Sequence, residues 1–237
     1  MLNSTISAES VTNKRKSIPN DGFIDKYLNR KISSFITALL IRTPVSANQV
    51  TIFNSFIGLS SIFFFMNGSY YNILIGAVIF QVNTIVDHCD GEIARQKNQS
   101  SRFGFWLDVT TDAIVSTVVV ISAGIGISTY LNEPSYIVWG AMAGCGILVS
   151  SLLVFYNAVK RDSDKDSLCF AITENGKEPT KLDAFVDGTL NKNLSFYFLL
   201  SAFTGMLHLL LIIAAIGVQV HCMLILVAVY KKRWSKN

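Results

Sequence analysis

The sequence predicts an all-α integral membrane protein with six transmembrane helices, an interfacial amphipathic helix before them, and both termini in the cytoplasm. Three observations support this fold class. Only 15% of the 237 residues are charged, whereas soluble domains usually carry about a quarter. Hydrophobic residues make up 51% of the chain, and its mean hydropathy is +0.43. These residues occur in long runs, and the basic residues gather between the runs.

Each predicted span is an apolar run, because crossing the hydrocarbon core as a helix takes about 20 residues. The first four runs are Val50–Met66, Tyr71–Val86, Phe105–Ser128 and Ser135–Val159. The last apolar stretch, Leu194–Val229, is too long for one span and short for two. We place a break at Gly205, which gives a fifth helix over Leu194–Phe203 with preceding turns from Asp183–Asn193, and a sixth over His208–Tyr230.

The distribution of positive charge decides between five and six spans. Cytoplasmic loops are enriched in Lys and Arg. Six spans place all 20 basic residues on one side, whereas five would place the basic C-terminus on the opposite side. We therefore predict a multi-pass protein with its polar site facing the cytoplasm and with the lipid bilayer as its surroundings.

Three segments are predicted along the chain. Residues 1–22 are rich in Ser, Thr and Asn, lack an apolar core, and are predicted to be a disordered cytoplasmic tail. Residues 23–47 place apolar side chains at helical spacing, which predicts an amphipathic helix in the headgroup plane. The alternative is a soluble helix packed on the cytoplasmic loops. Residues 48–237 form the transmembrane domain.

Acidic residues follow the second predicted span and recur at the start of the third. As helices, Asp87, Asp90, Gly91 and Ala94 share one face, and Gly104, Asp108 and Asp112 share another. One Asp at the bilayer centre costs about 2.5–3.5 kcal/mol, so four must face a hydrated cavity. Carboxylate ligands suit Mg²⁺ or Mn²⁺, and two such ions would clamp a pyrophosphate. Asp112 could instead act as a general base. A structural polar network and a cation pathway are the alternatives.

These residues resemble the signature of the CDP-alcohol phosphotransferases, also called CDP-alcohol phosphatidyltransferases. The shared pattern is D-x2-D-G-x2-A-R-x8-G-x3-D-x3-D, and all eight fixed positions are present. The resemblance implies two divalent cations on the four aspartates, Asp112 as the general base, and transfer of a phosphoalcohol from a CDP-alcohol donor to an alcohol or lipid acceptor with release of CMP. It implies nucleotide binding by Gly91, Ala94, Arg95 and Gly104, in phospholipid or polar phosphodiester biosynthesis. The rival function from another class is a divalent-cation transporter or channel.

Weaker similarities extend this prediction. Thr43 to Thr51 resembles the family's lead into the first span, which suggests Asn48 and Thr51 as nucleotide or phosphate contacts, with helix N-capping as the alternative. Other segments resemble the di-myo-inositol-phosphate-phosphate synthase branch. Lys160 and Arg161 are candidates for acceptor binding or for ordinary membrane anchoring. A GxxxG pattern over 140–144 packs within the chain or against a second copy, and the family resemblance favours a homodimer. No nucleic-acid partner is expected.

Overall fold

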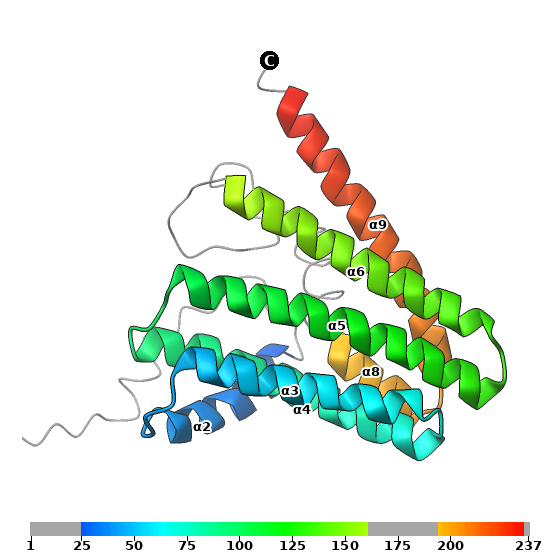
Figure 1. Ribbon diagram of the computed structural model, residues 1–237, viewed down its shortest axis with the longest axis horizontal. Helices are drawn as coiled ribbons and strands as arrows, with labels where there is room; N and C mark the ends of the chain where they lie inside the picture. The colour runs from blue at the N-terminus through cyan, green and yellow to red at the C-terminus, as the bar shows by residue number, and fades with distance from the viewer. Residues whose placement is uncertain (1–24, 161–193, 235–237) are drawn as a thin grey trace, which may run out of the picture.

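The computed structural model describes residues 25–160 and 194–234, and every element in these two ranges is helical (Figure 1). The helices are η1 (Asp25–Asn29), α2 (Arg30–Leu40), α3 (Ala47–Met66), α4 (Tyr70–Gln96), α5 (Arg102–Leu131), α6 (Ser135–Lys160), α8 (Leu194–Phe203) and α9 (Leu207–Trp234). Helix α3 packs against both α4 and α5, and α6 packs against α5 and α9. Figure 1 shows α9 crossing α6 and extending beyond it.

Five of these helices are long and apolar enough to cross a membrane, which confirms the predicted membrane class. They are α3, α4, α5, and the apolar parts of α6 and α9. Helix α8 has ten described residues, so it rises about 15 Å, half of a hydrocarbon core about 30 Å thick. The turns that would complete a sixth span belong to the predicted segment 183–193, which lies outside the described residues, as does the predicted tail.

Short polar motifs set where the helices begin and end. Ser46 caps α3 in a capping box with Gln49, and Ser69 and Ser101 cap α4 and α5 through their hydroxyls. The predicted break at Gly205 is confirmed, because this glycine has φ of +73° between α8 and α9. Helices α4 and α5 extend beyond the predicted spans at the site end, so every fixed position of the signature lies in a helix, from Asp87 to Arg95 in α4 and from Gly104 to Asp112 in α5.

Helix α2 packs against α4 through its polar face. Asn29 and Ser33 are fully buried, and the Oδ1 of Asn29 accepts a hydrogen bond from the Nε2 of Gln81 at 2.8 Å. The Oγ of Ser33 donates to the Oε1 of Glu92 at 3.2 Å. The apolar stripe of α2 faces outward instead, with Phe35 69% exposed. The place of residues 23–47 at the membrane surface stays a prediction, and an outward apolar face is compatible with it.

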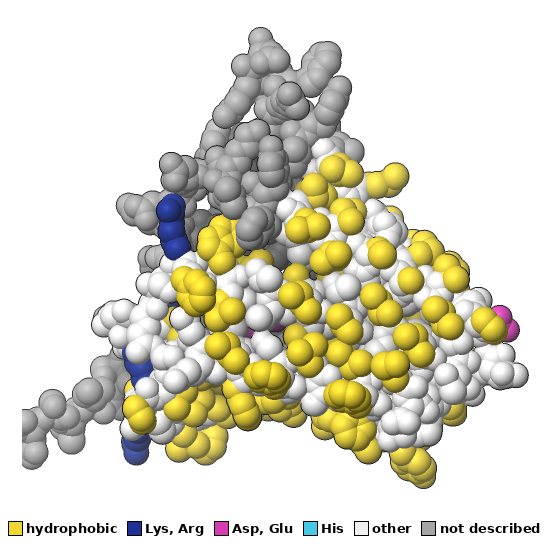
Figure 2. Space-filling model, viewed as in Figure 1, with side chains coloured by type: hydrophobic (Ala, Val, Ile, Leu, Met, Phe, Trp, Pro, Cys, Tyr) yellow, Lys and Arg dark blue, Asp and Glu magenta, His cyan; other side chains and the backbone are white. Residues whose placement is uncertain are grey.

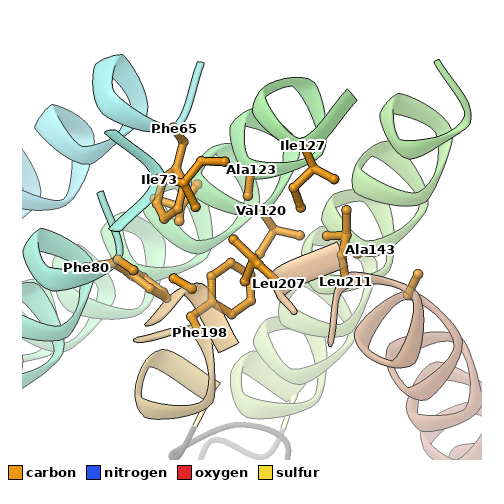
Figure 3. Close-up of a cluster of buried hydrophobic side chains, with 14 of the residues drawn as sticks. Phe65, Ile73, Phe80, Val120, Ala123, Ile127, Ala143, Phe198, Leu207 and Leu211 are labelled. Atoms are coloured by element: carbon orange, nitrogen blue, oxygen red, sulfur yellow. The ribbon is translucent and has the colours of Figure 1, made fainter. Parts of the chain in front are cut away.

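A hydrophobic core joins α8 and α9 to the first three long helices. Phe198 of α8 is fully buried and meets the rings of Phe65 and Phe80 edge-on, at centroid distances of 6.3 and 5.8 Å (Figure 3). The Tyr70 hydroxyl donates to the Phe203 carbonyl at 2.8 Å. The end of α8 therefore lies beside the start of α4, and these two helices run antiparallel.

Close backbone contacts join α5 to its neighbours. A Cβ on Gly140 would lie 2.9 Å from the Cα of Gly124, and one on Gly144 would lie 2.6 Å from the side chain of Ile121. The predicted GxxxG pattern therefore packs against α5 of the same chain. The homodimer stays a prediction that this motif no longer supports.

The closest backbone approach of α5, at Gly126, predicts the effect of a substitution. A Cβ at position 126 would lie within 2 Å of the Phe65 carbonyl oxygen, which belongs to the backbone and cannot swing away. We expect Gly126→Ala to lower the Tm by about 3–10 °C, measured by thermal unfolding in detergent. Cys145→Ala, at an exposed position on α6, is the control and should leave the Tm nearly unchanged. An unchanged Tm for Gly126→Ala would contradict this close approach of α3 and α5.

Candidate active site

Three aspartates from two helices form the centre of the candidate site. Asp87 and Asp90 lie one turn apart on α4, and Asp108 lies in the second turn of α5. Each offers a carboxylate oxygen, and these oxygens lie within 4.8 Å of one another. The short connection after Gln96 brings the end of α4 and the start of α5 to the same end of the bundle, as the sequence prediction requires.

Asp112 completes the predicted set of four. It lies one turn beyond Asp108, and its side chain shares a hydrogen bond with that of Asp87. It is also close enough to Asp90 and Asp108 to interact with them electrostatically. Asp90 is 5% exposed, whereas Asp112 is exposed. Asp112 is therefore the residue of the cluster that lies nearest the surface of the helix bundle, and Asp90 is the most deeply buried.

The chemistry of this cluster fits hard divalent cations. Four carboxylates repel one another when they are ionised in a low-dielectric environment. A bound cation would relieve this repulsion, and oxygen-only ligands match the preference of Mg²⁺ and Mn²⁺. The predicted metal ligands are thus together in space, with donor atoms of the right type.

Thr51 holds one of the aspartates in place. Its Oγ1 donates to the Oδ2 of Asp90 at 2.5 Å, and both side chains are buried. The helix-capping alternative for Asn48 and Thr51 is wrong, because Ser46 is the N-cap of α3. The sequence predicted that Thr51 contacts a nucleotide or phosphate. Its contact with Asp90 could not be predicted, because the spacing of Thr51 from Ala47 within α3 says nothing about a partner on α4.

The predicted nucleotide-binding residues lie in two pairs beside the aspartates. A Cβ on Gly104 would lie 2.7 Å from the Oδ1 of Asn48, so the asparagine side chain occupies the space that the glycine leaves. A Cβ on Gly91 would lie 3.3 Å from the Arg95 guanidinium, which lies over that glycine. Ala94 packs beside a small cluster of buried apolar side chains around Ile93. Asn48, Gly104, Gly91 and Arg95 thus lie near the aspartates, whereas Ala94 lies against apolar side chains, and nucleotide binding by these residues stays a prediction.

Other residues of the sequence prediction have different positions. Glu92 points to Ser33 of α2, in agreement with its predicted place off the aspartate face. His88 was also placed off that face, yet it lies close enough to Asp90 and Asp112 to interact with their charges. Helical spacing did not indicate this proximity. Lys160 is the last residue of α6, and its side chain, like Arg161, lies outside the described part of the structure.

A prominent surface hollow lies apart from this cluster. An apolar groove between α4 and α8 is lined by Leu74, Val78, Phe196, Leu199, Leu200 and Phe203. None of the aspartates lines it. Because every lining residue is apolar, the groove offers no group for metal or phosphate chemistry, and the aspartate cluster remains the candidate site.

A protein-family model matches most of the chain. The family model described as CDP-alcohol phosphatidyltransferase matches residues 44–229. Among curated proteins, a "Bifunctional IPC transferase and DIPP synthase" from Aquifex aeolicus is 35% identical over 95 residues, covering 40% of this chain and 21% of the relative. A protein of the same name from Archaeoglobus fulgidus is 36% identical over 95 residues, 40% of this chain and 18% of the relative. The chain thus spans about a fifth of the length of these relatives.

Solved structures share the fold at low sequence identity. A phosphatidylinositol phosphate synthase from Mycobacterium tuberculosis with CDP-DAG bound is 18% identical, with a TM-score of 0.62, over 84% of this chain and 94% of that one. The same enzyme in complex with manganese and citrate is 20% identical, with a TM-score of 0.56, over 84% and 88% of the two chains. These likenesses confirm the helical membrane fold.

The repulsion among the aspartates predicts a stability effect that does not require any substrate. In EDTA, Asp108→Asn should raise the Tm by a few degrees, because it removes one of the mutually repelling negative charges. A gain of about 1 kcal/mol in the free energy of unfolding corresponds to about 2–4 °C in a protein of this size. The same variant should lose most of the stabilisation that Mn²⁺ gives the wild type. Thermal unfolding with and without Mn²⁺ measures both effects. Glu133→Gln, at an exposed position between α5 and α6, is the matched control. An equal Mn²⁺ shift in Asp108→Asn and wild type would contradict a metal site at Asp108.

Proposed function

The chain belongs to the CDP-alcohol phosphatidyltransferase family, and from this premise we propose that it transfers a phosphoalcohol from a CDP-alcohol to a hydroxyl acceptor and releases CMP. The observation that carries the proposal is the cluster of Asp87, Asp90 and Asp108, whose oxygens lie within 4.8 Å of one another. The family match gives no support to the rival cation transporter, which would also leave the paired glycine positions unexplained.

The four aspartates have distinct proposed roles. Asp87, Asp90 and Asp108 would hold two divalent cations, Mg²⁺ or Mn²⁺, with Asp112 as a further ligand. Bound there, the cations would neutralise the pyrophosphate of the donor and favour in-line displacement. Thr51 keeps the Asp90 carboxylate oriented through its 2.5 Å hydrogen bond.

Asp112 is the proposed general base, because its position in the signature matches the base of the family and because it is the most exposed residue of the four aspartates. It accepts the proton of the acceptor hydroxyl. That oxygen forms a bond to the phosphorus that carries the donor's alcohol. The bond from this phosphorus to the oxygen bridging the two phosphates breaks, and the electron pair leaves with CMP.

The nucleotide is proposed to lie beside the two glycine pairs. Gly91 and Gly104 lack side chains next to the aspartates, and Asn48 and Arg95 occupy the space beside them. The Asn48 amide and the Arg95 guanidinium both carry N–H groups that could donate hydrogen bonds to a phosphate or a base. Ala94 limits the bulk on the same face. Lys160 and Arg161 remain proposed contacts for the acceptor.

We further propose six spans, both termini in the cytoplasm and a cytoplasmic active site. Basic side chains gather at one edge of the view in Figure 2, the end where α2 and the α4–α5 connection lie. Helix α8 runs antiparallel to α4, so α9 returns towards the basic end. The outward apolar face of α2 supports its place in the headgroup plane at that end.

The substrates are proposed by class. The curated relatives bear the name IPC transferase and DIPP synthase, and a structural neighbour binds CDP-DAG. A panel of CDP-alcohols, including CDP-inositol and CDP-DAG, tested against polar and lipid hydroxyl acceptors with CMP as the readout, separates a polar phosphodiester synthase from a phospholipid synthase. Mn²⁺ flux into proteoliposomes without CMP release would contradict the proposal.

The base assignment predicts the effect of one substitution. Asp112→Asn should lower kcat for CMP release by about 10²-fold or more, because general-base catalysis contributes about 10²–10⁴-fold. EDTA should abolish the activity of the wild type. Glu92→Gln is the matched control, since this carboxylate lies on α4 near the aspartates but points to Ser33, and the variant should keep most of the activity. Wild-type kcat in Asp112→Asn would overturn the base assignment.

A further inference from the structure

A lysine just after α4 binds the connection between α2 and α3. The Nζ of Lys97 donates to the carbonyl oxygens of Leu40, Thr43 and Val45 at 3.5, 2.7 and 2.7 Å. A lysine ammonium has three donors, so this arrangement uses all of them on the main chain. Leu40 is the last residue of α2, where carbonyls lack partners within the helix.

A second contact holds the same connection from the α3 side. The Oε1 of Gln99 accepts a hydrogen bond from the main-chain nitrogen of Ala47 at 3.1 Å. The main-chain nitrogen of Gln99 donates to the Ala94 carbonyl at 2.8 Å, which fixes Gln99 to the end of α4. Ala47 is the first residue of α3. The segment after α4 therefore hydrogen-bonds main-chain atoms of the connection 41–46 and of the two residues that flank it, Leu40 and Ala47.

The start of α3 carries two residues of the proposed site. Thr51 donates to Asp90, and Asn48 lies against Gly104. Ser46 caps the start of α3, and the contacts of Lys97 and Gln99 fasten that start to the end of α4. We propose that Lys97 is a positioning residue of the metal site, which acts through the α2–α3 connection to keep Thr51 on Asp90. This inference rests on the proposed function, because it assumes that Asp90 is a metal ligand.

The alternative is that Lys97 only caps the C-terminus of α2. Capping and positioning differ in what they change. A cap affects the stability of the fold, whereas a positioning residue affects the affinity of the site for Mn²⁺. Groups that orient metal ligands typically contribute about 10–100-fold in metal affinity, and a residue one step further out should contribute less.

The test measures Mn²⁺ binding to the purified full chain in detergent by the electron paramagnetic resonance of free Mn²⁺, with no substrate present. We expect Lys97→Met to weaken Mn²⁺ binding about 3–10-fold and Lys97→Arg to restore it to within about twofold of wild type. Arg42→Met is the matched control, because it removes a positive charge from the same connection at an exposed side chain. It should bind Mn²⁺ as the wild type does.

A double-substitution cycle shows whether Lys97 acts through Thr51. Thr51→Val should weaken Mn²⁺ binding about tenfold, and adding Lys97→Met should weaken it little further. If Lys97→Met does not fold, Gln99→Leu removes the second contact and should weaken binding in the same direction. Unchanged affinity in the folded Lys97 or Gln99 variant, or fully additive effects with Thr51→Val, would overturn the inference. Absence of Mn²⁺ binding by the wild type would instead overturn the proposed metal site, and the inference with it.

Discussion

The close approach of α4 and α5 to a shared neighbour, α3, determines where every carboxylate of the site lies. These two helices carry the aspartates but make few contacts with each other, whereas both pack closely on α3. Small buried residues of α3 make this possible at Ala47, Thr51, Asn54, Gly58 and Ser61. A Cβ on Gly58 would lie 2.4 Å from Val115 of α5 and 3.0 Å from the amide of Asn83 of α4. A larger residue there would separate the two helices and with them Asp87 and Asp108.

Polar contacts orient helices that apolar burial alone would leave free to rotate. Within a membrane, lipid is as apolar as a leucine side chain, so helices associate through close packing and hydrogen bonds. The Nδ2 of Asn83 donates to the Asn54 carbonyl at 2.9 Å, and Thr51 donates to Asp90 one turn nearer the site. Helix α2 follows the same rule, because its polar face meets α4 while its apolar face points outward. These contacts favour one rotation of α4, the one that directs its aspartates to α5.

The site combines a buried aspartate and an exposed one, which suits the proposed transfer between two substrates. Asp90 is buried and held by Thr51, whereas Asp112 is exposed on the neighbouring helix. A buried, oriented ligand suits a metal that stays bound through the reaction. An accessible carboxylate suits a base that must meet an acceptor hydroxyl from outside. The two properties belong to different helices, since Asp90 lies on α4 beneath Thr51 of α3 and Asp112 lies on α5.

The sequence alone determined the membrane class, the helical spacing of the four aspartates and the break at Gly205. Long apolar runs, fixed residue spacings and a glycine that can adopt a positive φ are all local properties of the chain. Local spacing also predicted that Asp87 and Asp90 share a face. It could not predict that Thr51 bonds Asp90, that Asn48 lies against Gly104, or that His88 comes near Asp112. Those contacts join residues on different helices or depend on how a helix is rotated. Only the tertiary packing of α3 against α4 and α5 decides them, because side chains far apart in the chain meet where backbones approach closely.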